Sequence, residues 1–218
     1  MGFGHSSDRA TVYIVEPDHN VRASLQELLR INGYWALGLS SAESLLHQLV
    51  DAEVPCCLIT EVQLPGMTGL ELQRRIAASR TWLPTIFLTN CSQTEIVVRA
   101  MKGAAIDYLL KPYASRQLLQ SIEAALRVSR TRSKCETLSR QTRERLAQLT
   151  PREREVAELL VQGLSTKEVA SSLQISGKTV FVHRAHALAK MEVESIVQLS
   201  NLLAGCDPLS TAPLLHQA

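Results

Sequence analysis

The stretch CLITEVQLPGMTGLEL, Cys57 to Leu72, contains the transition that decides the fold. Its first residues, Cys57 to Thr60, form a short apolar run that is typical of a buried strand. The run stops at Glu61, and the turn residues Pro65 and Gly66 then lead into a helical pattern. Because ligands bind at the carboxyl ends of strands in proteins that alternate strands and helices, Glu61 is a candidate functional residue.

The same order of strand and helix recurs four more times before residue 128. Five such units predict an α/β fold, a five-stranded doubly wound parallel sheet with helices on both faces. The expected strands are residues 11–15, 34–39, 56–60, 84–89 and 107–110. The expected helices are residues 20–33, 41–50, 69–79, 94–104 and 115–128.

Chemically distinctive side chains lie at or just after the ends of four of the five expected strands, and a parallel sheet brings such positions to one edge. Carboxylates hold Mg²⁺, a lysine pairs with phosphoryl oxygens, and a hydroxyl hydrogen-bonds one of them. The combination therefore predicts a pocket for a phosphate and a metal. Its members, in strand order, are Glu16 with Pro17 and Asp18, then Glu61, Thr89 and Lys111.

Residues 11–127 resemble the receiver domain of two-component response regulators, which has a flavodoxin-like fold. The matching blocks are VYIVEPDHNVRASL, LPGMTGLEL, IFLT and AMKGAAIDYLLKPY. The resemblance implies that position 61 is where receivers carry an aspartate that accepts phosphate from a histidine kinase, and that the acids after the first strand bind Mg²⁺. It also implies that Thr89 and Lys111 read the phosphate, that Tyr108 swings inward when the threonine moves, and that the Lys111–Pro112 peptide is cis.

Two residues depart from the receiver pattern where the chemistry takes place. Glu61 carries its carboxylate about 1.5 Å farther from the backbone than an aspartate does. Pro17 supplies no carboxylate, and Asp18 is then one place out of register. Mg²⁺ requires contacts of about 2.0–2.1 Å, and a misplacement of about 1 Å costs about 10²-fold in rate. Phosphorylation and Mg²⁺ binding are therefore expected to be weak or absent, and no cofactor is expected.

Three interpretations of Glu61 are open at this point. In the first, Glu61 pairs with Lys111 and imitates the phosphorylated state, with one negative charge against roughly −1.5 to −2 for a phosphate. In the second, the receiver is a degenerate scaffold for dimerisation. In the third, a histidine kinase still phosphorylates the receiver at low efficiency.

From Leu149 onward the pattern changes to short helices. Thr150, Pro151 and Glu153 have the spacing of a capped helix start. Two helices, expected at residues 165–174 and 177–191, are separated by a short turn containing glycine, which is the layout of a helix-turn-helix. With a first helix in residues 149–163 and a last one in residues 194–205, the sequence predicts a small all-α domain of four helices.

Residues 149–205 closely resemble the LuxR-type helix-turn-helix domain of the NarL/FixJ response regulators. The matching blocks are LTPREREV, GLSTKEVASSL and ISGKTVFVHRAHALAKM. The resemblance implies a motif from Thr166 to Ala185 and double-stranded promoter DNA as the partner. Core positions would be Val169, Ala170, Leu173, Ile175 and Val180. Candidates for phosphate contacts are Thr166, Lys167, Ser176, Lys178, Thr179 and Lys190.

The expected base-reading face is apolar, with Phe181, Val182 and, one turn later, Ala185. Apolar side chains meet thymine methyl groups but offer no hydrogen bond to guanine. His183 and Arg184 are the polar readers in this region, although His183 could equally be a packed helix residue. An A·T-rich DNA site is therefore expected.

Residues 128–148 contain six Lys and Arg against two Glu, and no Gly or Pro, which predicts a helical linker. The last seventy residues contain six Lys and Arg against seven Asp and Glu. Because phosphate contacts supply much of DNA affinity, a domain without net positive charge is expected to bind as a dimer. The expected dimer surface includes Val97, Val98 and Met101.

Composition excludes several other classes of protein. No apolar run approaches about 18 residues, so no membrane span is expected, and the N-terminus lacks the pattern of a signal peptide. Five cysteines without a Cys-x-x-Cys pair argue against a zinc site or a disulfide framework. The sequence thus predicts a cytoplasmic, non-enzymatic transcription regulator that binds DNA as a homodimer, with a histidine kinase or another regulator as a further possible partner. A protein that sequesters such a partner without binding DNA is the alternative.

Overall fold

The computed structural model describes residues 10–49, 55–78 and 83–204 and divides into two compact units, with the boundary after Ser133. Each unit is built around its own core. Within the described ranges, no helix combines the length and the apolar character needed to cross a membrane.

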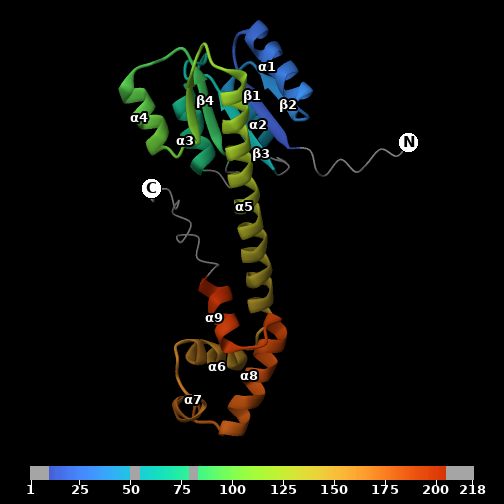
Figure 1. The fold of residues 1–218 in the computed structure, drawn as a ribbon. Coiled ribbons are helices and arrows are strands. Elements are labelled where there is room, and N and C mark those ends of the chain that lie inside the picture. The colour runs from blue at the N-terminus through green and yellow to red at the C-terminus, as the bar shows by residue number, and fades with distance from the viewer. Residues whose placement is uncertain (1–9, 50–54, 79–82, 205–218) are drawn as a thin grey trace, which may run out of the picture. The chain divides into compact units, whose positions relative to one another are not determined.

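A parallel five-stranded sheet forms the centre of the N-terminal unit (Figure 1). The strands are β1 (Thr11–Val15), β2 (Trp35–Leu39), β3 (Cys56–Thr60), β4 (Thr85–Thr89) and β5 (Asp107–Leu110), in the spatial order β2-β1-β3-β4-β5. The predicted fold class is confirmed. Val15 lies opposite Thr60 in the pairing of β1 with β3. The residues after these two strands, Glu16 and Glu61, therefore emerge side by side.

Helices cover both faces of this sheet: α1 (His19–Ile31), α2 (Ala42–Gln48), α3 (Gly69–Ala78), α4 (Thr94–Lys102) and the first part of α5 (Ser115–Ala147). Apolar residues of α1 and α5 pack on one face, around Leu29 and Ile122. Residues of α2 and α3 pack on the other face, around Leu45 and Leu72. Val50 and Ser79, at the ends of two predicted helices, lie outside the described residues.

Helix α5 is continuous over 33 residues and includes most of the segment that composition marked as a linker. The boundary between the compact units falls inside it. The helical character of residues 128–147 follows from the good helix formers in this segment, whereas the domain limits themselves stay a prediction.

Four short helices follow in the C-terminal unit: α6 (Pro151–Val161), α7 (Thr166–Leu173), α8 (Gly177–Met191) and α9 (Ile196–Ala204). Thr150 and Glu153 form a reciprocal capping box at the start of α6, as their spacing predicted. The turn between α7 and α8 is residues 174–176, and Gln174 adopts a left-handed conformation there, with φ of 54°. Gly205, the last residue of the expected domain, lies outside the described residues.

Candidate functional site

The carboxyl edge of the sheet holds an open pocket of about 370 Å³. Six of the seven residues predicted for the phosphate site line it, and the seventh, Tyr108, donates a hydrogen bond to Cys91 in the loop that follows β4. Sequence reasoning missed the remaining lining residues, because three of them lie in loops, which carry no periodic pattern, and Val21 belongs to the apolar pattern of a helix. The lining residues are Glu16, Pro17, Asp18, Val21, Glu61, Gln63, Thr89, Asn90, Cys91 and Lys111.

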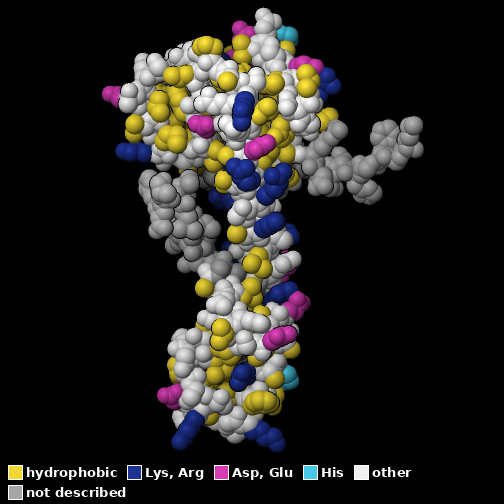
Figure 2. Space-filling view, viewed as in Figure 1, with side chains coloured by type: hydrophobic (Ala, Val, Ile, Leu, Met, Phe, Trp, Pro, Cys, Tyr) yellow, Lys and Arg dark blue, Asp and Glu magenta, His cyan; other side chains and the backbone are white. Residues whose placement is uncertain are grey.

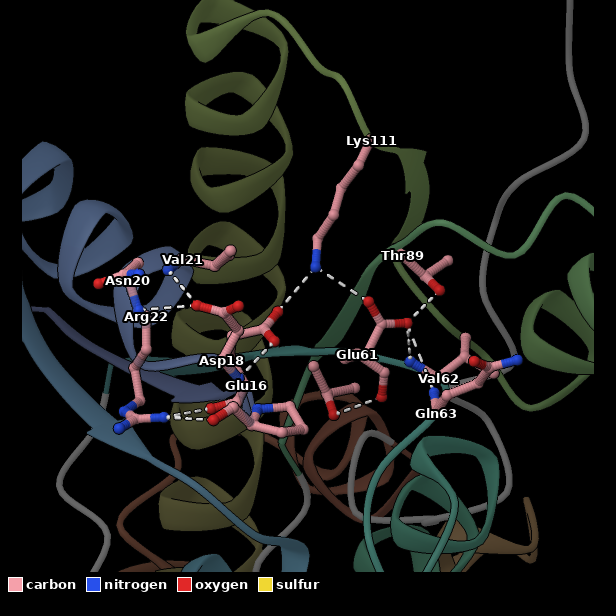
Figure 3. A network of polar contacts seen from close by, with 12 residues as sticks. Glu16, Asp18, Asn20, Val21, Arg22, Glu61, Val62, Gln63, Thr89 and Lys111 are labelled. Carbon is pink, nitrogen blue, oxygen red and sulfur yellow. Dashed lines mark hydrogen bonds and ion pairs between the residues drawn. The ribbon is translucent and has the colours of Figure 1, made fainter.

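Lys111 bridges two glutamates in this pocket (Figure 3). Its ammonium nitrogen lies 2.7 Å from Oε2 of Glu16 and 2.9 Å from Oε2 of Glu61. Burial opposes protonation of the lysine, but its hydrogen bonds to Glu16 and Glu61 outweigh burial and raise the pKa of Lys111. Lys111 is therefore charged at neutral pH and forms an ion pair with each of the two carboxylates. The peptide bond between Lys111 and Pro112 is cis, as the resemblance to receiver domains implied.

The second oxygen of Glu61 is also fully engaged. Oε1 accepts hydrogen bonds from the backbone N–H groups of Val62, at 2.8 Å, and Gln63, at 3.4 Å, and from the hydroxyl of Thr89. Figure 3 shows the carboxylate aimed between Lys111 and Thr89. Glu61 thus contacts with its own carboxylate the two side chains that the receiver pattern assigns to the phosphate.

Thr89 and Tyr108 are connected through a single residue, Cys91. The backbone N–H of Cys91 donates to the Thr89 hydroxyl at 3.1 Å, and its carbonyl accepts the Tyr108 hydroxyl at 2.7 Å. The Tyr108 ring packs against Phe87, with centroids 5.8 Å apart. Desolvation raises the pKa of Tyr108, and the nearby Cys91 adds to the shift, so the hydroxyl stays protonated and serves as a donor.

Asp18, the displaced acid, is the cap of helix α1. Its Oδ1 accepts the backbone N–H groups of Asn20, at 2.7 Å, and Val21, at 3.1 Å, and these two bonds lower the pKa of Asp18. Arg22 holds the same loop by donating to the carbonyls of Glu16 and Pro17, at 2.6 and 3.1 Å. The loop is therefore arranged for helix capping, which ties the Asp18 carboxylate to the backbone.

The donor set of the pocket does not fit Mg²⁺. A magnesium site needs several oxygen ligands in octahedral geometry, yet a cation, the Lys111 ammonium, already lies between the Glu16 and Glu61 carboxylates, and Pro17 supplies no side-chain oxygen. Elsewhere in the described ranges, no cluster of three or more His, Cys, Asp and Glu side chains is arranged to hold a metal. The cation between the two glutamates is instead the Lys111 ammonium.

In the C-terminal unit, the five core residues expected for the helix-turn-helix lie in its core, so that prediction is confirmed. Val169 and Val180 are fully buried, and the other three pack against them. The buried face of α8 continues through Ala187 and Met191. This packing fixes which side of α8 is left for a partner.

The predicted DNA-contact residues occupy three places in this unit. Thr166 and Lys167 begin α7. Ser176 caps α8 by accepting the Thr179 N–H at 3.0 Å, and Lys178 lies exposed beside them. On α8 itself, three residues are exposed and two are half-buried at the margin of the core: the exposed ones are Phe181, Val182 and Ala185, and the half-buried ones are His183 and Arg184.

Lys190 is engaged inside the domain. Its ammonium donates to Oε2 of Glu153 at 2.6 Å, and that hydrogen bond is the main reason that the pKa of Glu153 falls to about 2. The capping pattern identified Glu153 as a helix start but gave no indication of this partner. A phosphate contact by Lys190 stays a prediction that would compete with the ion pair.

Both units match known protein families. Residues 12–123 match the response regulator receiver domain family, and residues 147–203 match the bacterial regulatory proteins of the luxR family. Nodulation protein W of Bradyrhizobium diazoefficiens is 34% identical over 91% of this chain and 87% of its own length. The transcriptional regulatory protein FixJ of that organism is 34% identical over 88% of this chain and 93% of its own.

A solved structure leads to the same family. The structure of the response regulator StyR is 33% identical, covers 90% of this chain and 98% of its own, and gives a TM-score of 0.77. The chain therefore belongs to the response regulators of the NarL/FixJ type, in which a receiver domain is followed by a LuxR-type DNA-binding domain that regulates transcription.

Proposed function

We propose that this protein is a sequence-specific DNA-binding regulator whose receiver acts without phosphorylation at position 61. One observation carries the proposal: the Glu61 carboxylate is bonded at the same time to Lys111 and to Thr89. These are the side chains with which a receiver reads its phosphate. The extra methylene of glutamate lets a permanent negative charge reach both of them.

The proposed output runs from Glu61 through Thr89 and Cys91 to Tyr108, which lies on β5. Exposed apolar side chains on α4 and β5 form the face next to this chain of contacts: they are Val98, Met101 and Leu110. We assign this face to the homodimer, together with Val97. Two DNA-binding domains then offer two half-sites, and a dimer doubles the number of phosphate contacts that one domain makes.

The chemistry of the pocket argues against efficient phosphorylation. Attack by Glu61 on a phosphodonor requires in-line alignment, but its carboxylate lies about 1.5 Å farther from the backbone than that of an aspartate, and Val62, Thr89 and Lys111 hold it in a different position. No acid stands at position 17 to help hold a metal. In this proposal, a histidine kinase is a possible binding partner that transfers no phosphate. The place of action is the cytoplasm, where the promoter DNA is.

Incubation with radiolabelled acetyl phosphate and Mg²⁺ tests phosphorylation directly. The wild-type protein should remain unlabelled. Glu61→Asp alone should label weakly because Pro17 is still present, and the Pro17→Asp, Glu61→Asp double variant should label more than either single variant. Efficient labelling of the wild-type protein would overturn the proposal and support residual phosphorylation by a kinase.

DNA binding without any phosphodonor tests whether Glu61 holds the receiver in its active state. The wild-type protein should footprint a promoter and sediment as a dimer. Glu61→Ala should weaken dimerisation and DNA affinity together by on the order of tenfold, a usual size for coupling between sites. Glu27→Ala is the matched control, because Glu27 is an exposed glutamate of the same domain that pairs with the neighbouring Arg30 on the surface of α1. Equal affinity of Glu61→Ala and wild type would show that the receiver is a passive scaffold.

Exposed apolar residues in the C-terminal unit favour a second candidate function. Phe181 and Val197 are both well exposed there. A protein that sequesters another regulator through such a surface would give no specific footprint on any promoter. The DNA-binding regulator should give a specific footprint.

A further inference from the structure

The solvent face of α8 is an apolar stripe with one cation at its start. Residues at helical spacings of three, four, seven and eleven from Lys178 share one face. All of them are exposed: Lys178, Phe181, Val182, Ala185 and Ala189. Phe181 is 65% exposed and Val182 is 42% exposed. Large apolar side chains placed together on a surface mark an interaction site.

Beyond Lys178, the polar side chains of α8 lie beside this stripe, and the exposed His186 borders it, one position after Ala185. His183 and Arg184 flank the buried face and are half-buried. Lys190 is bound to Glu153, and the Ser176 and Thr179 hydroxyls contact each other at 2.7 Å. The centre of the stripe, Phe181, Val182 and Ala185, therefore offers only methyl and aromatic surface. In the space-filling view, hydrophobic side chains reach the surface of the unit that holds α6 to α9, with Lys and Arg side chains nearby (Figure 2).

We infer that this stripe reads the 5-methyl groups of thymine in the major groove, with Phe181 as the principal contact. The inference rests on the proposed function as a DNA-binding regulator and specifies its DNA sequence class. In a helix-turn-helix, the N-terminal half of the second helix meets the base edges. The only apolar group that a base pair presents in the major groove is the methyl of thymine, and Phe181, Val182 and Ala185 supply the apolar surface that it needs. Lys178, one turn before Phe181, serves the phosphate backbone.

Methyl reading differs from a general preference for A·T pairs. A protein that reads the adenine edge or the groove width responds to the base pair, whereas this stripe responds to a single carbon atom. Deoxyuridine has the hydrogen-bonding edge of thymine and lacks only that carbon. Burial of one such group contributes about fourfold in affinity.

The experiment uses the full-length protein and a DNA site obtained by unbiased selection. Each thymine of the site is replaced in turn by deoxyuridine, and the dissociation constant is measured by fluorescence anisotropy at a fixed salt concentration. One or two replacements per half-site should weaken binding of the wild-type protein about fourfold each. Phe181→Ala should bind the thymine site more weakly and should no longer distinguish thymine from deoxyuridine there.

The matched control is Ile31→Ala, which removes an apolar side chain of the receiver domain that is 69% exposed. It should bind both DNAs as the wild type does. Because Phe181 is exposed, Phe181→Ala should melt at the wild-type temperature, which excludes loss of folding as the cause.

Each result is decisive. Specific binding that no deoxyuridine replacement weakens would overturn the inference and leave the proposed function intact. A deoxyuridine effect that persists in Phe181→Ala would remove Phe181 from the contact, and unchanged DNA affinity of Phe181→Ala would reassign the stripe to a protein partner. Failure of the wild-type protein to select any DNA would instead overturn the proposed function.

Discussion

Lys190 of α8 donates a hydrogen bond to Glu153 of α6 across 2.6 Å, although 37 residues separate them in the chain. The Glu153 side chain is only 5% exposed, and it also accepts the backbone N–H of Thr150 at 2.8 Å. One carboxylate therefore caps α6 and attaches α8 to it. The presentation of α8 depends on this pair.

Replacing Lys190 by methionine should destabilise the C-terminal unit, because Glu153 then keeps a buried charge without its partner. A lost hydrogen bond to a charged group costs about 1.5–3 kcal/mol, and the lower end is expected because the Lys190 side chain is 35% exposed. Hydrogen exchange should speed up in α6 and α8 and stay unchanged in the receiver sheet. Arg152→Met, which breaks the exposed pair with Glu155, is the control and should have little effect.

Acid should remove the same stabilisation. The pKa of Glu153 falls from 4.5 to about 2, mainly through the hydrogen bond from Lys190, while the hydrogen bonds with Thr150 contribute a smaller part. The pair therefore stabilises the fold fully above pH 4.5 and loses this contribution as the pH falls toward 2. The difference in unfolding free energy between wild type and Lys190→Met should shrink over that interval, as followed by urea titrations of the α8 amide signals in NMR spectra. A difference that stays constant between pH 5 and about 2 would contradict this assignment.

Millimolar Mg²⁺ should leave the melting temperature of the wild-type protein unchanged, because Lys111 already lies between Glu16 and Glu61. Lys111→Met removes that cation and leaves two buried carboxylates facing each other, which should cost about 3–5 kcal/mol. Addition of Mg²⁺ or Mn²⁺ should then restore part of the lost melting temperature, as measured by differential scanning fluorimetry. The control is Lys102→Met on α4. Stabilisation of the wild-type protein by Mg²⁺ at constant ionic strength would show that the pocket has a metal site after all.

Gln73 of α3 should be needed for the position of α4. Its buried amide donates to the carbonyls of Ala100, at 3.2 Å, and Gly103, at 2.9 Å. Gln73→Met keeps the size but loses both bonds, and should cost about 1–3 kcal/mol and speed up hydrogen exchange in α4.

A nearby glycine and a second glutamine give the comparisons for Gln73. Gly103→Ala should act in the same direction, since a Cβ there would lie 2.5 Å from the Gln73 side-chain oxygen. Gln26→Met, which removes a single 3.4 Å bond to Ala36, should have a smaller effect. Equal losses for the two methionine variants would argue against a special role for Gln73.

Features encoded by neighbouring residues were predictable from the sequence. The apolar runs gave the five parallel strands, and the Thr150 to Glu153 spacing gave the capped start of α6. The meeting of Glu16, Glu61 and Lys111 was also predictable, because parallel strands place their ends at one edge. Their distances confirm that these three lie together.

The hydrogen-bond partners of the individual side chains could not be predicted in the same way. The double contact of Lys111 joins residues 50 and 95 positions apart and depends on strand register and rotamers. The capping role of Asp18 depends on neighbouring residues only, but the resemblance to receivers led to its interpretation as a displaced metal ligand. Lys190 was assigned to DNA from its place in a motif, and its pair with Glu153 arises only when α6 and α8 pack together.

The bridge made by Lys111 has a consequence for how a cell would control such a regulator. A metal or a phosphoryl group comes and goes, but a lysine is a permanent part of the chain. If the pocket is held in one state by its own residues, as we propose, signal strength is set by the number of molecules present. Transcription of its own gene and proteolysis then take the place that a kinase and a phosphatase occupy in ordinary two-component pathways.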